Sequence, residues 1–294
     1  TGSIVNDAGL IQSAGAMTID THGGTLVNTN AAGYANGQGG IVSADTLHIA
    51  TGAAGGPFGR LDNGAGFIGS KNALTVSNGD FVNGRGGLVL GQSTLAIDTH
   101  GATYDNRGGQ TLAVGALQVD AGSIQNVGAL IRSSATTTLR AGSVDNTATS
   151  GTDEGIEGKN VGITATTVSN ASGAIRADVN VALNSTGLVD NGAGGLVSAG
   201  DSVVITDPNA AVAGAKILSV TNAGTLLAGK TLTVDAASLT STGKLLSQGD
   251  TNLALTQDVT LVAGSETIAN HDLRIATSGN IANSGRIAAG NDLS

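Results

Sequence analysis

An asparagine recurs along the chain, in several places after an interval of 20 residues, and the residue two positions before it is apolar each time. A repeat of this length constrains the fold strongly, because one unit cannot bury its apolar side chains alone and must stack on its neighbours. We expect Thr242 and Leu261 to take the place of the asparagine in two further units. The asparagines of the repeat are Asn6, Asn28, Asn63, Asn83, Asn106, Asn126, Asn146, Asn170, Asn191, Asn222 and Asn283.

Each unit contains the pattern of three short strands separated by turns. In the segment 81–97, FVNGRGGLVLGQSTLAI, glycines follow the asparagine, an aliphatic run follows the glycines, and an alternating apolar pair ends the unit. Alternation with a period of two indicates a strand that is buried on one face. The pairs are Met17 and Ile19, Leu47 and Ile49, Leu74 and Val76, Leu95 and Ile97, Leu117 and Val119, Val161 and Ile163, Val181 and Leu183, Val203 and Ile205, Leu232 and Val234, Leu253 and Leu255, and Leu273 and Ile275.

These features predict an all-β fold, a parallel β-helix of about 13 coils with about 20 residues per coil plus loop insertions. Residues 1–294 are expected to form one continuous repeat segment, an internal fragment of a longer protein. At about 4.8 Å per coil, it would be a monomeric rod about 60 Å long. Asparagine suits the turn of each coil because it tolerates left-handed backbone geometry, and we expect its amide to hydrogen-bond the asparagines above and below it.

Four insertions interrupt the spacing, near residues 29–40, 50–60, 147–160 and 206–217. Both prolines of the chain lie in insertions, where a missing backbone donor does not disturb a strand ladder. If the protein recognises a partner directly, these loops are where we expect the contacts. The candidate binding residues are Tyr34, Phe58, Asp153, Glu154 and Pro208.

The composition argues against several classes of function. The chain has 47 Gly, no Cys and 2% aromatic residues, which indicates a narrow core of small aliphatic side chains and rules out disulfides and thiolate metal sites. Its net charge of −9 and its scattered Lys and Arg argue against nucleic-acid binding. There is no run of 18 or more apolar residues, so no membrane-spanning helix is expected.

The pentapeptide IDTHG occurs twice, at residues 19–23 and 97–101, and places His22 and His100 each two residues after an aspartate. In the predicted register the two copies lie three coils apart, about 14 Å, which is too far for one metal ion to bind both. We therefore expect two exposed turns. His48 and His271 are isolated in the sequence.

No catalytic residues, cofactor or metal site are predicted. The acidic insertion with Asp153, Glu154 and Glu157 lacks the regular aspartate spacing of a calcium loop, so a solvated loop is expected. Some parallel β-helices are polysaccharide lyases and hydrolases, but here the carboxylates do not recur at one coil position and aromatic residues are few. We therefore expect that the protein is not an enzyme.

The segments 220–246 (VTNAGTLLAGKTLTVDAASLTSTGKLL) and 281–294 (IANSGRIAAGNDLS) resemble the haemagglutinin repeats of filamentous haemagglutinin and of contact-dependent growth inhibition effectors. These are two-partner-secretion exoproteins of Gram-negative bacteria. The resemblance follows N-x-G-x-[LI]-x-[AS]-G-x-L-x-[LIV], is good at Asn222 and Asn283, and is looser in most other coils. It implies a right-handed β-helical shaft that is secreted through an outer-membrane transporter and folds at the cell surface.

From the resemblance we expect a structural shaft of a secreted, cell-surface adhesin or growth-inhibition effector, which holds distal binding or toxin regions away from the cell. It thus implies roles in cell adhesion and virulence. The alternative is an adhesin module whose insertion loops bind a receptor or glycan on a host or target cell. No functional residues follow from the resemblance, because the repeat positions are structural.

Overall fold

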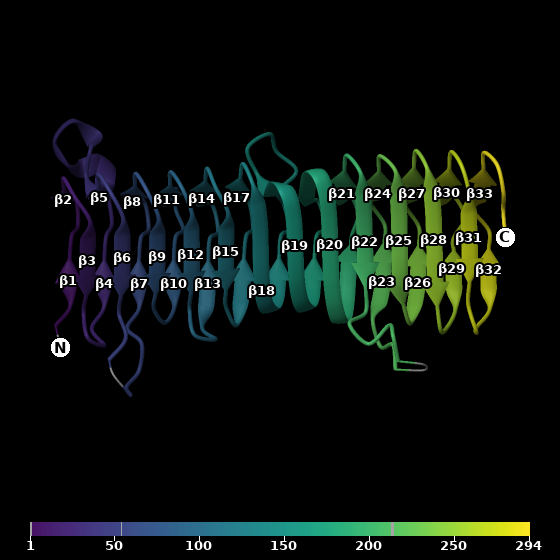
Figure 1. The fold of residues 1–294 in the computed structure, drawn as a ribbon, viewed down its shortest axis with the longest axis horizontal. Helices are drawn as coiled ribbons and strands as arrows, with labels where there is room; N and C mark the ends of the chain where they lie inside the picture. The colour runs from purple at the N-terminus through teal and green to yellow at the C-terminus, as the bar shows by residue number, and fades with distance from the viewer. Residues whose placement is uncertain (1, 54, 213–214) are drawn as a thin grey trace. The chain divides into compact units, whose positions relative to one another are not determined.

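The computed structural model describes residues 2–53, 55–212 and 215–294. It contains two compact units, Thr1–Gly142 and Ser143–Ser294, and within each unit parallel strands stack coil upon coil (Figure 1). The chain makes about 13 turns of about 22 residues each. The predicted parallel β-helix is confirmed.

Each coil of the first unit contributes one strand to each of three parallel sheets. The first sheet precedes the asparagine turn and contains β1 (Ile4–Val5), β4 (Leu26–Val27), β7 (Leu61–Asp62), β10 (Phe81–Val82), β13 (Thr103–Asp105) and β16 (Ser123–Gln125). The second follows that turn and contains β2 (Leu10–Ser13), β5 (Gly40–Ser43), β8 (Phe67–Ser70), β11 (Leu88–Gly91), β14 (Gln110–Ala113) and β17 (Leu130–Ser133). The third ends the coil and contains β3 (Met17–Asp20), β6 (Leu47–Ala50), β9 (Leu74–Ser77), β12 (Leu95–Asp98) and β15 (Leu117–Asp120).

The second unit repeats this arrangement. Its first sheet contains β23 (Ser219–Asn222), β26 (Ser238–Ser241), β29 (Val259–Leu261) and β32 (Ile281–Asn283). Its second contains β21 (Leu196–Ala199), β24 (Thr225–Ala228), β27 (Lys244–Ser247), β30 (Glu266–Ala269) and β33 (Arg286–Ala289). Its third contains β22 (Ser202–Thr206), β25 (Thr231–Ala236), β28 (Asp250–Leu255) and β31 (Leu273–Ala276).

Three longer strands continue around the corners between sheets. They are β18 (Thr136–Asp145), β19 (Gly155–Ser169) and β20 (Ala174–Asn191). Along β19, Ile156, Val161 and Val168 pair in turn with residues of β20, so that one strand passes through all three sheet positions of its coil. Two register shifts, between Gly158 and Asn160 and between Ala165 and Thr167, accompany the bends.

The register within the first unit follows the predicted repeat. Phe81 pairs with Leu61 on one side and with Tyr104 on the other, and all three are fully buried. Leu95 and Ile97 pair likewise with the apolar pairs of the coils before and after them. Each sheet therefore supplies one or two columns of buried side chains, and these columns fill the narrow core.

The predicted apolar pair of one coil is displaced by two residues. Thr251 and Leu253, rather than Leu253 and Leu255, pair with Leu232 and Val234. Thr251 is fully buried, and its hydroxyl bonds to the Ser247 hydroxyl at 2.8 Å. The pattern of alternating apolar residues does not include this position, because threonine carries a polar hydroxyl group.

The insertion predicted at 147–160 is shorter in the structure. Strand β19 begins at Gly155, and Val161 lies well inside it, paired with Val181. The insertion predicted at 29–40 contains two single-turn 3-10 helices, η1 (Ala31–Gly33) and η2 (Ala35–Gly37), which no feature of the sequence indicates. Helical turns were not expected anywhere, because no 3.6-residue stripe is present.

A buried tyrosine and a buried threonine form a matched pair in the core. Tyr104 occupies the column of Phe81, and its hydroxyl bonds to the hydroxyl of Thr111. Thr111 in turn stands in the column of Val89 and Ile131, and also donates to Asn106 Oδ1 at 3.0 Å. Burial raises the pKa of Tyr104 far above its ordinary value, so the hydroxyl stays neutral.

We expect Tyr104→Phe to lower the free energy of unfolding by about 1–2 kcal/mol, because it leaves the buried Thr111 hydroxyl with one partner fewer. The double variant Tyr104→Phe, Thr111→Val should have a free energy of unfolding close to that of the wild type. Phe81 and Val89 occupy the two equivalent positions in the neighbouring coil, which are already apolar there. A double-mutant cycle in urea measures the coupling. Additive losses in the double variant would contradict the pairing.

Candidate functional site

The asparagines of the repeat form a continuous ladder inside each unit. In the first unit Nδ2 of one asparagine donates to Oδ1 of the next, with distances of 2.7 Å (Asn6 to Asn28), 2.6 Å (Asn28 to Asn63), 2.7 Å (Asn63 to Asn83), 2.8 Å (Asn83 to Asn106) and 2.8 Å (Asn106 to Asn126). In the second unit the distances are 2.8 Å for Asn146 to Asn170, Asn170 to Asn191 and Asn191 to Asn222. The predicted bonds between neighbouring asparagines are present.

Most ladder amides also donate to a backbone carbonyl of the next coil. Asn83 Nδ2, for example, donates at 2.9 Å to the carbonyl of Gln110, the first residue of β14. The ladder asparagines themselves do not adopt left-handed geometry. It occurs two residues later, as at Ala65 (φ 53°) and Arg85 (φ 57°), because the chain reverses only after the asparagine has completed the strand.

The ladder ends differently from the prediction in the second unit. Ser241, not Thr242, pairs with Asn222 and accepts its amide at 3.2 Å. Leu261 stands in the next coil as predicted, but it offers no amide to Asn283, which is exposed and accepts only from the backbone N–H of Gly285 among the described residues. The apolar residue two positions before Ser241, Leu239, was the signal that could have located it.

A second polar column, missed in the sequence, closes the turn after the third sheet. Thr21, Thr51 and Thr99 are buried, and their hydroxyls donate to backbone carbonyls at 2.6, 2.6 and 2.7 Å. In the IDTHG segments the threonine is thus the structural residue. His100 takes the exposed left-handed position that follows it, and its backbone N–H donates to Asp98 Oδ1 at 2.7 Å.

The two IDTHG turns lie three coils apart, as predicted, through the paired residues Ile19, Ile49, Val76 and Ile97. The His22 side chain is 70% exposed, as expected for a surface turn. The His100 side chain is 33% exposed, because the ring of Phe58 stacks on it with centroids 3.6 Å apart. A candidate binding residue, Phe58, is therefore already partly covered within the protein.

The loop 29–40 carries Tyr34, which is 37% exposed. Its base is fixed by Thr29 and Asn30, whose side chains each donate to Asp7 Oδ1 at 2.7 Å. These two bonds hold the pKa of Asp7 below its ordinary value. Tyr34 therefore sits on an anchored loop with part of its ring open to solvent.

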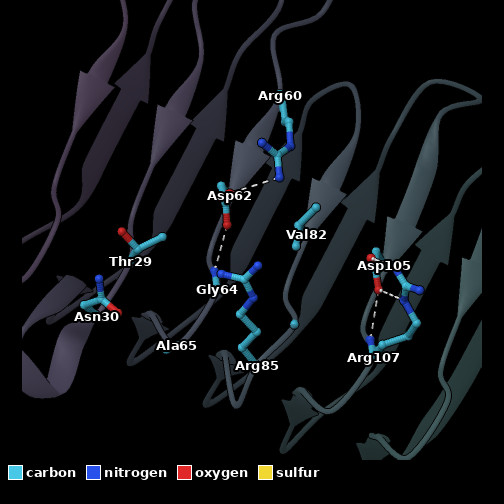
Figure 2. A pocket seen from close by; sticks show the side chains of 11 residues that line it. Thr29, Asn30, Arg60, Asp62, Gly64, Ala65, Val82, Arg85, Asp105 and Arg107 are labelled. Atoms are coloured by element: carbon cyan, nitrogen blue, oxygen red, sulfur yellow. Dashed lines mark hydrogen bonds and ion pairs between the residues drawn. The ribbon is translucent and has the colours of Figure 1, made fainter.

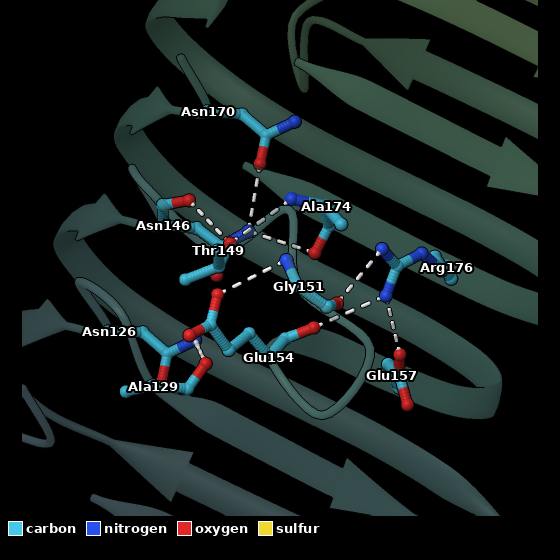
Figure 3. Close-up of polar contacts among 10 residues, drawn as sticks. All are labelled: Asn126, Ala129, Asn146, Thr149, Gly151, Glu154, Glu157, Asn170, Ala174 and Arg176. Carbon is cyan, nitrogen blue, oxygen red and sulfur yellow. Dashed lines mark hydrogen bonds and ion pairs between the residues drawn. The ribbon is translucent and has the colours of Figure 1, made fainter. Parts of the chain in front are cut away.

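The acidic loop that precedes β19 is held by an arginine (Figure 3). Arg176 Nη1 donates to Glu157 Oε1 at 2.7 Å and to the Glu154 backbone carbonyl at 3.2 Å. The Glu154 carboxylate accepts from the backbone N–H of Gly151 at 3.1 Å. These glutamates are engaged within the protein, while Asp153 is exposed.

The loop 206–217 is closed by one buried carboxylate, Asp207. It accepts the backbone N–H groups of Asn209 at 2.8 Å, Ile217 at 2.5 Å and Leu218 at 2.8 Å. Burial alone would raise the pKa of Asp207, but these donors outweigh it and leave the pKa below its ordinary value. Pro208, the predicted binding residue, is exposed beside this clamp.

We expect Asp207→Ala to release the loop, at a cost of about 2–3 kcal/mol for the lost charge-assisted bonds. Because the folded pKa is depressed, the stabilisation is complete above the ordinary value of about 3.9 and is lost as the pH falls through the folded pKa. NMR titration of the Ile217 and Leu218 amide protons measures that midpoint. Asp201→Ala, which removes only an exposed ion pair with Lys230, is the control; an equal effect would contradict the clamp.

His271 is not isolated as predicted. Its Nδ1 lies 2.7 Å from Asp250 Oδ1 and 3.4 Å from Asp272 Oδ2, and ligand atoms of the three side chains lie within 4.8 Å of one another. The bond to Asp250 and the field of Asp272 raise the pKa of His271 above its ordinary value. The charged histidine therefore stabilises this exposed cluster at low pH, and the contribution is lost as the pH rises through the folded pKa. His48 bonds to Thr75 Oγ1 at 2.7 Å.

Sequence reasoning missed a cationic hollow of about 610 Å³ on the outer face of β7, β10 and β13 (Figure 2). Arg60, Arg85 and Arg107 line it. A signal was available, because each arginine stands within three residues of a ladder asparagine in three successive coils.

A scan against protein-family models and searches of curated proteins and solved structures found no match to this chain. In the part of the chain that the structure describes, none of the helices has the length and apolar character required to cross a membrane.

Proposed function

We propose that this chain is a structural shaft segment that holds other regions of a larger protein at a distance. The observation that supports this most is the uninterrupted stacking within each unit. The asparagine ladder and the aliphatic columns use the recurring side chains of most coils for contact with the next coil. Such a β-solenoid gains length with each added coil, by about 4.8 Å, without requiring any new kind of contact.

The cellular location is proposed from the resemblance to haemagglutinin repeats in segments 220–246 and 281–294. On this basis the protein belongs with the filamentous haemagglutinins and growth-inhibition effectors. It would cross the outer membrane of a Gram-negative bacterium through a two-partner-secretion transporter. Its distal binding or toxin region would then act in adhesion or in contact with a target cell.

The test is a whole-coil deletion in the full gene product. Removing residues 84–106 joins Asn83 to Arg107 and brings Asn83 against Asn126, so both columns remain in register. We expect surface display and the activity of the distal region to persist. A deletion of half that length, residues 84–94, breaks the register and should abolish display. Loss of activity in a whole-coil deletion that is still displayed would overturn the shaft role.

A second candidate is an adhesin module that binds a receptor or glycan through its insertion loops. It is favoured by the exposure of Tyr34 and Pro208 on loops that are anchored at their bases. Tyr34→Ser and Pro208→Ser leave those anchors in place. A loss of cell binding with unchanged display would favour the module over the shaft.

A further inference from the structure

In the cationic hollow of the first unit, one of the three arginines has no internal partner among the residues that the structure describes. Arg60 pairs with Asp62 at 3.0 Å, and Arg107 bonds to Asp105 through both Nε, at 2.9 Å, and Nη2, at 2.6 Å. Among the described residues, the Arg85 guanidinium makes neither an ion pair nor a hydrogen bond, and it extends toward Gly64, on the side of the hollow where Asp62 lies (Figure 2). Arg85 is exposed and occupies left-handed backbone geometry, with φ 57°.

The strand register sets the spacing of the charges. Asp62, Val82 and Asp105 pair in one outward column of β7, β10 and β13, so the two carboxylates lie about 10 Å apart with a small apolar side chain between them. Burial works against ionisation of Asp105, but its bonds to Arg107 and the field of Arg60 leave its pKa lowered.

The formal charge of the hollow is +1, from three arginines and two aspartates. A ligand with one negative charge would neutralise Arg85. A dianion or a dense run of charges would also face the repulsion of the aspartates. Each aspartate oxygen that accepts one internal hydrogen bond can accept another. Hydrogen-bond donors of the ligand that lie on either side of its negative charge would therefore find acceptors in Asp62 and Asp105.

We propose that this hollow binds an acidic saccharide with one carboxylate per charged sugar, which Arg85 holds by a bidentate ion pair while Asp62 and Asp105 accept from flanking hydroxyl groups. In a saccharide chain the hydroxyl groups of the sugars before and after a uronate supply donors on either side of its carboxylate, which fits this order of charges. An acidic peptide has a backbone carbonyl acceptor for each amide N–H donor, so it offers the two aspartates fewer donors than a chain of hydroxyl groups does. Val82 and Ala65 supply the apolar floor for ring carbons.

The probe is a tetrasaccharide that contains unsulfated glucuronate, titrated into the whole chain by calorimetry and followed by NMR of the Arg85 side-chain N–H. We expect Arg85→Asn, which suits the left-handed position, to weaken binding by roughly 10–100-fold, the loss typical of a charge-assisted bond. Arg140→Gln is the control, because Arg140 is an exposed arginine of the same unit, paired with Asp120 at 3.4 Å outside the hollow. The affinity of this control variant for the tetrasaccharide should be within about twofold of the wild-type affinity.

Three comparison ligands decide the chemistry. The carboxyl-reduced tetrasaccharide should lose as much affinity as Arg85→Asn does. A sulfated analogue that binds more tightly would overturn the preference for one charge, and a glutamate-rich peptide that binds more tightly would overturn the saccharide. The proposal also fails if the glucuronate probe does not bind, or if Arg85→Asn and Arg140→Gln bind it equally.

Discussion

Leu95→Asp is expected to lower the free energy of unfolding by at least about 4 kcal/mol. Leu95 is 1% exposed and lies between Leu74 and Leu117 in its column, so an aspartate there removes apolar contacts on both sides and places a buried charge between two leucines. The midpoint of urea denaturation, followed by far-UV circular dichroism, measures the loss. A fall of the midpoint by about 1 M urea or more, or failure to fold, is the expected result.

Ala96→Asp is the matched control for this change. Ala96 is the next residue of the same strand, and its side chain is exposed on the outer face. Since neighbouring residues of a strand point to opposite faces, the same charge should cost less than about 1 kcal/mol there. Equal shifts for the two variants would contradict the assigned inward and outward faces.

Asn83→Asp is expected to cost about 3 kcal/mol at neutral pH, although the side chain keeps its size. The carboxylate can still accept from Asn63, but it has no donor for Asn106 Oδ1 or for the Gln110 carbonyl, which the amide reaches at 2.8 and 2.9 Å. Two acceptors then face a buried negative charge. Burial should raise the folded pKa of the new carboxyl, so the deficit shrinks as the pH falls toward about 4 and the protonated acid regains one donor.

The same substitution at Asn283 is the control, because this residue occupies the equivalent repeat position but is exposed. Asn283→Asp retains the acceptor for the Gly285 N–H, so we expect a change below about 0.5 kcal/mol. Urea midpoints at pH 4 and pH 7 for both variants give the comparison. A pH-independent loss in Asn83→Asp would show that the ladder does not depend on its donors.

The sequence was sufficient to predict the β-helix because asparagine and the apolar residue before it repeat at a nearly constant interval. The failures occur where a hydroxyl residue takes an inward position. Thr111, Thr137 and Thr251 are fully buried in columns otherwise filled by aliphatic residues, and Ser241 replaces an asparagine. A hydrophobic pattern cannot find such residues, since their hydroxyls are satisfied by neighbours that only the folded coil provides.

The candidate sites were predictable only in part. The interrupted spacing located the loops, but not the contacts that fix them: Asp207 closes its loop onto Leu218, eleven residues later, and Arg176 reaches the acidic loop from the next coil. The hollow around Arg85 likewise depends on residues about 20 positions apart that become neighbours only through coil stacking. The sequence shows which residues belong to one coil, whereas these sites lie between coils.

The amides of the asparagine ladder all point the same way, with each Nδ2 donating toward the coil that follows. Their dipoles therefore add along the column, and each bond polarises the next. A coil presents donors to the following coil and acceptors to the preceding one, so two coils fit together in one direction only. Within a unit, the ladder therefore restricts the orientation of a coil but not its position in the stack. Tandem duplication of a coil in the gene keeps this orientation and can lengthen the ladder. Two ladders cannot be joined head to head, because their joined ends would not match donors with acceptors.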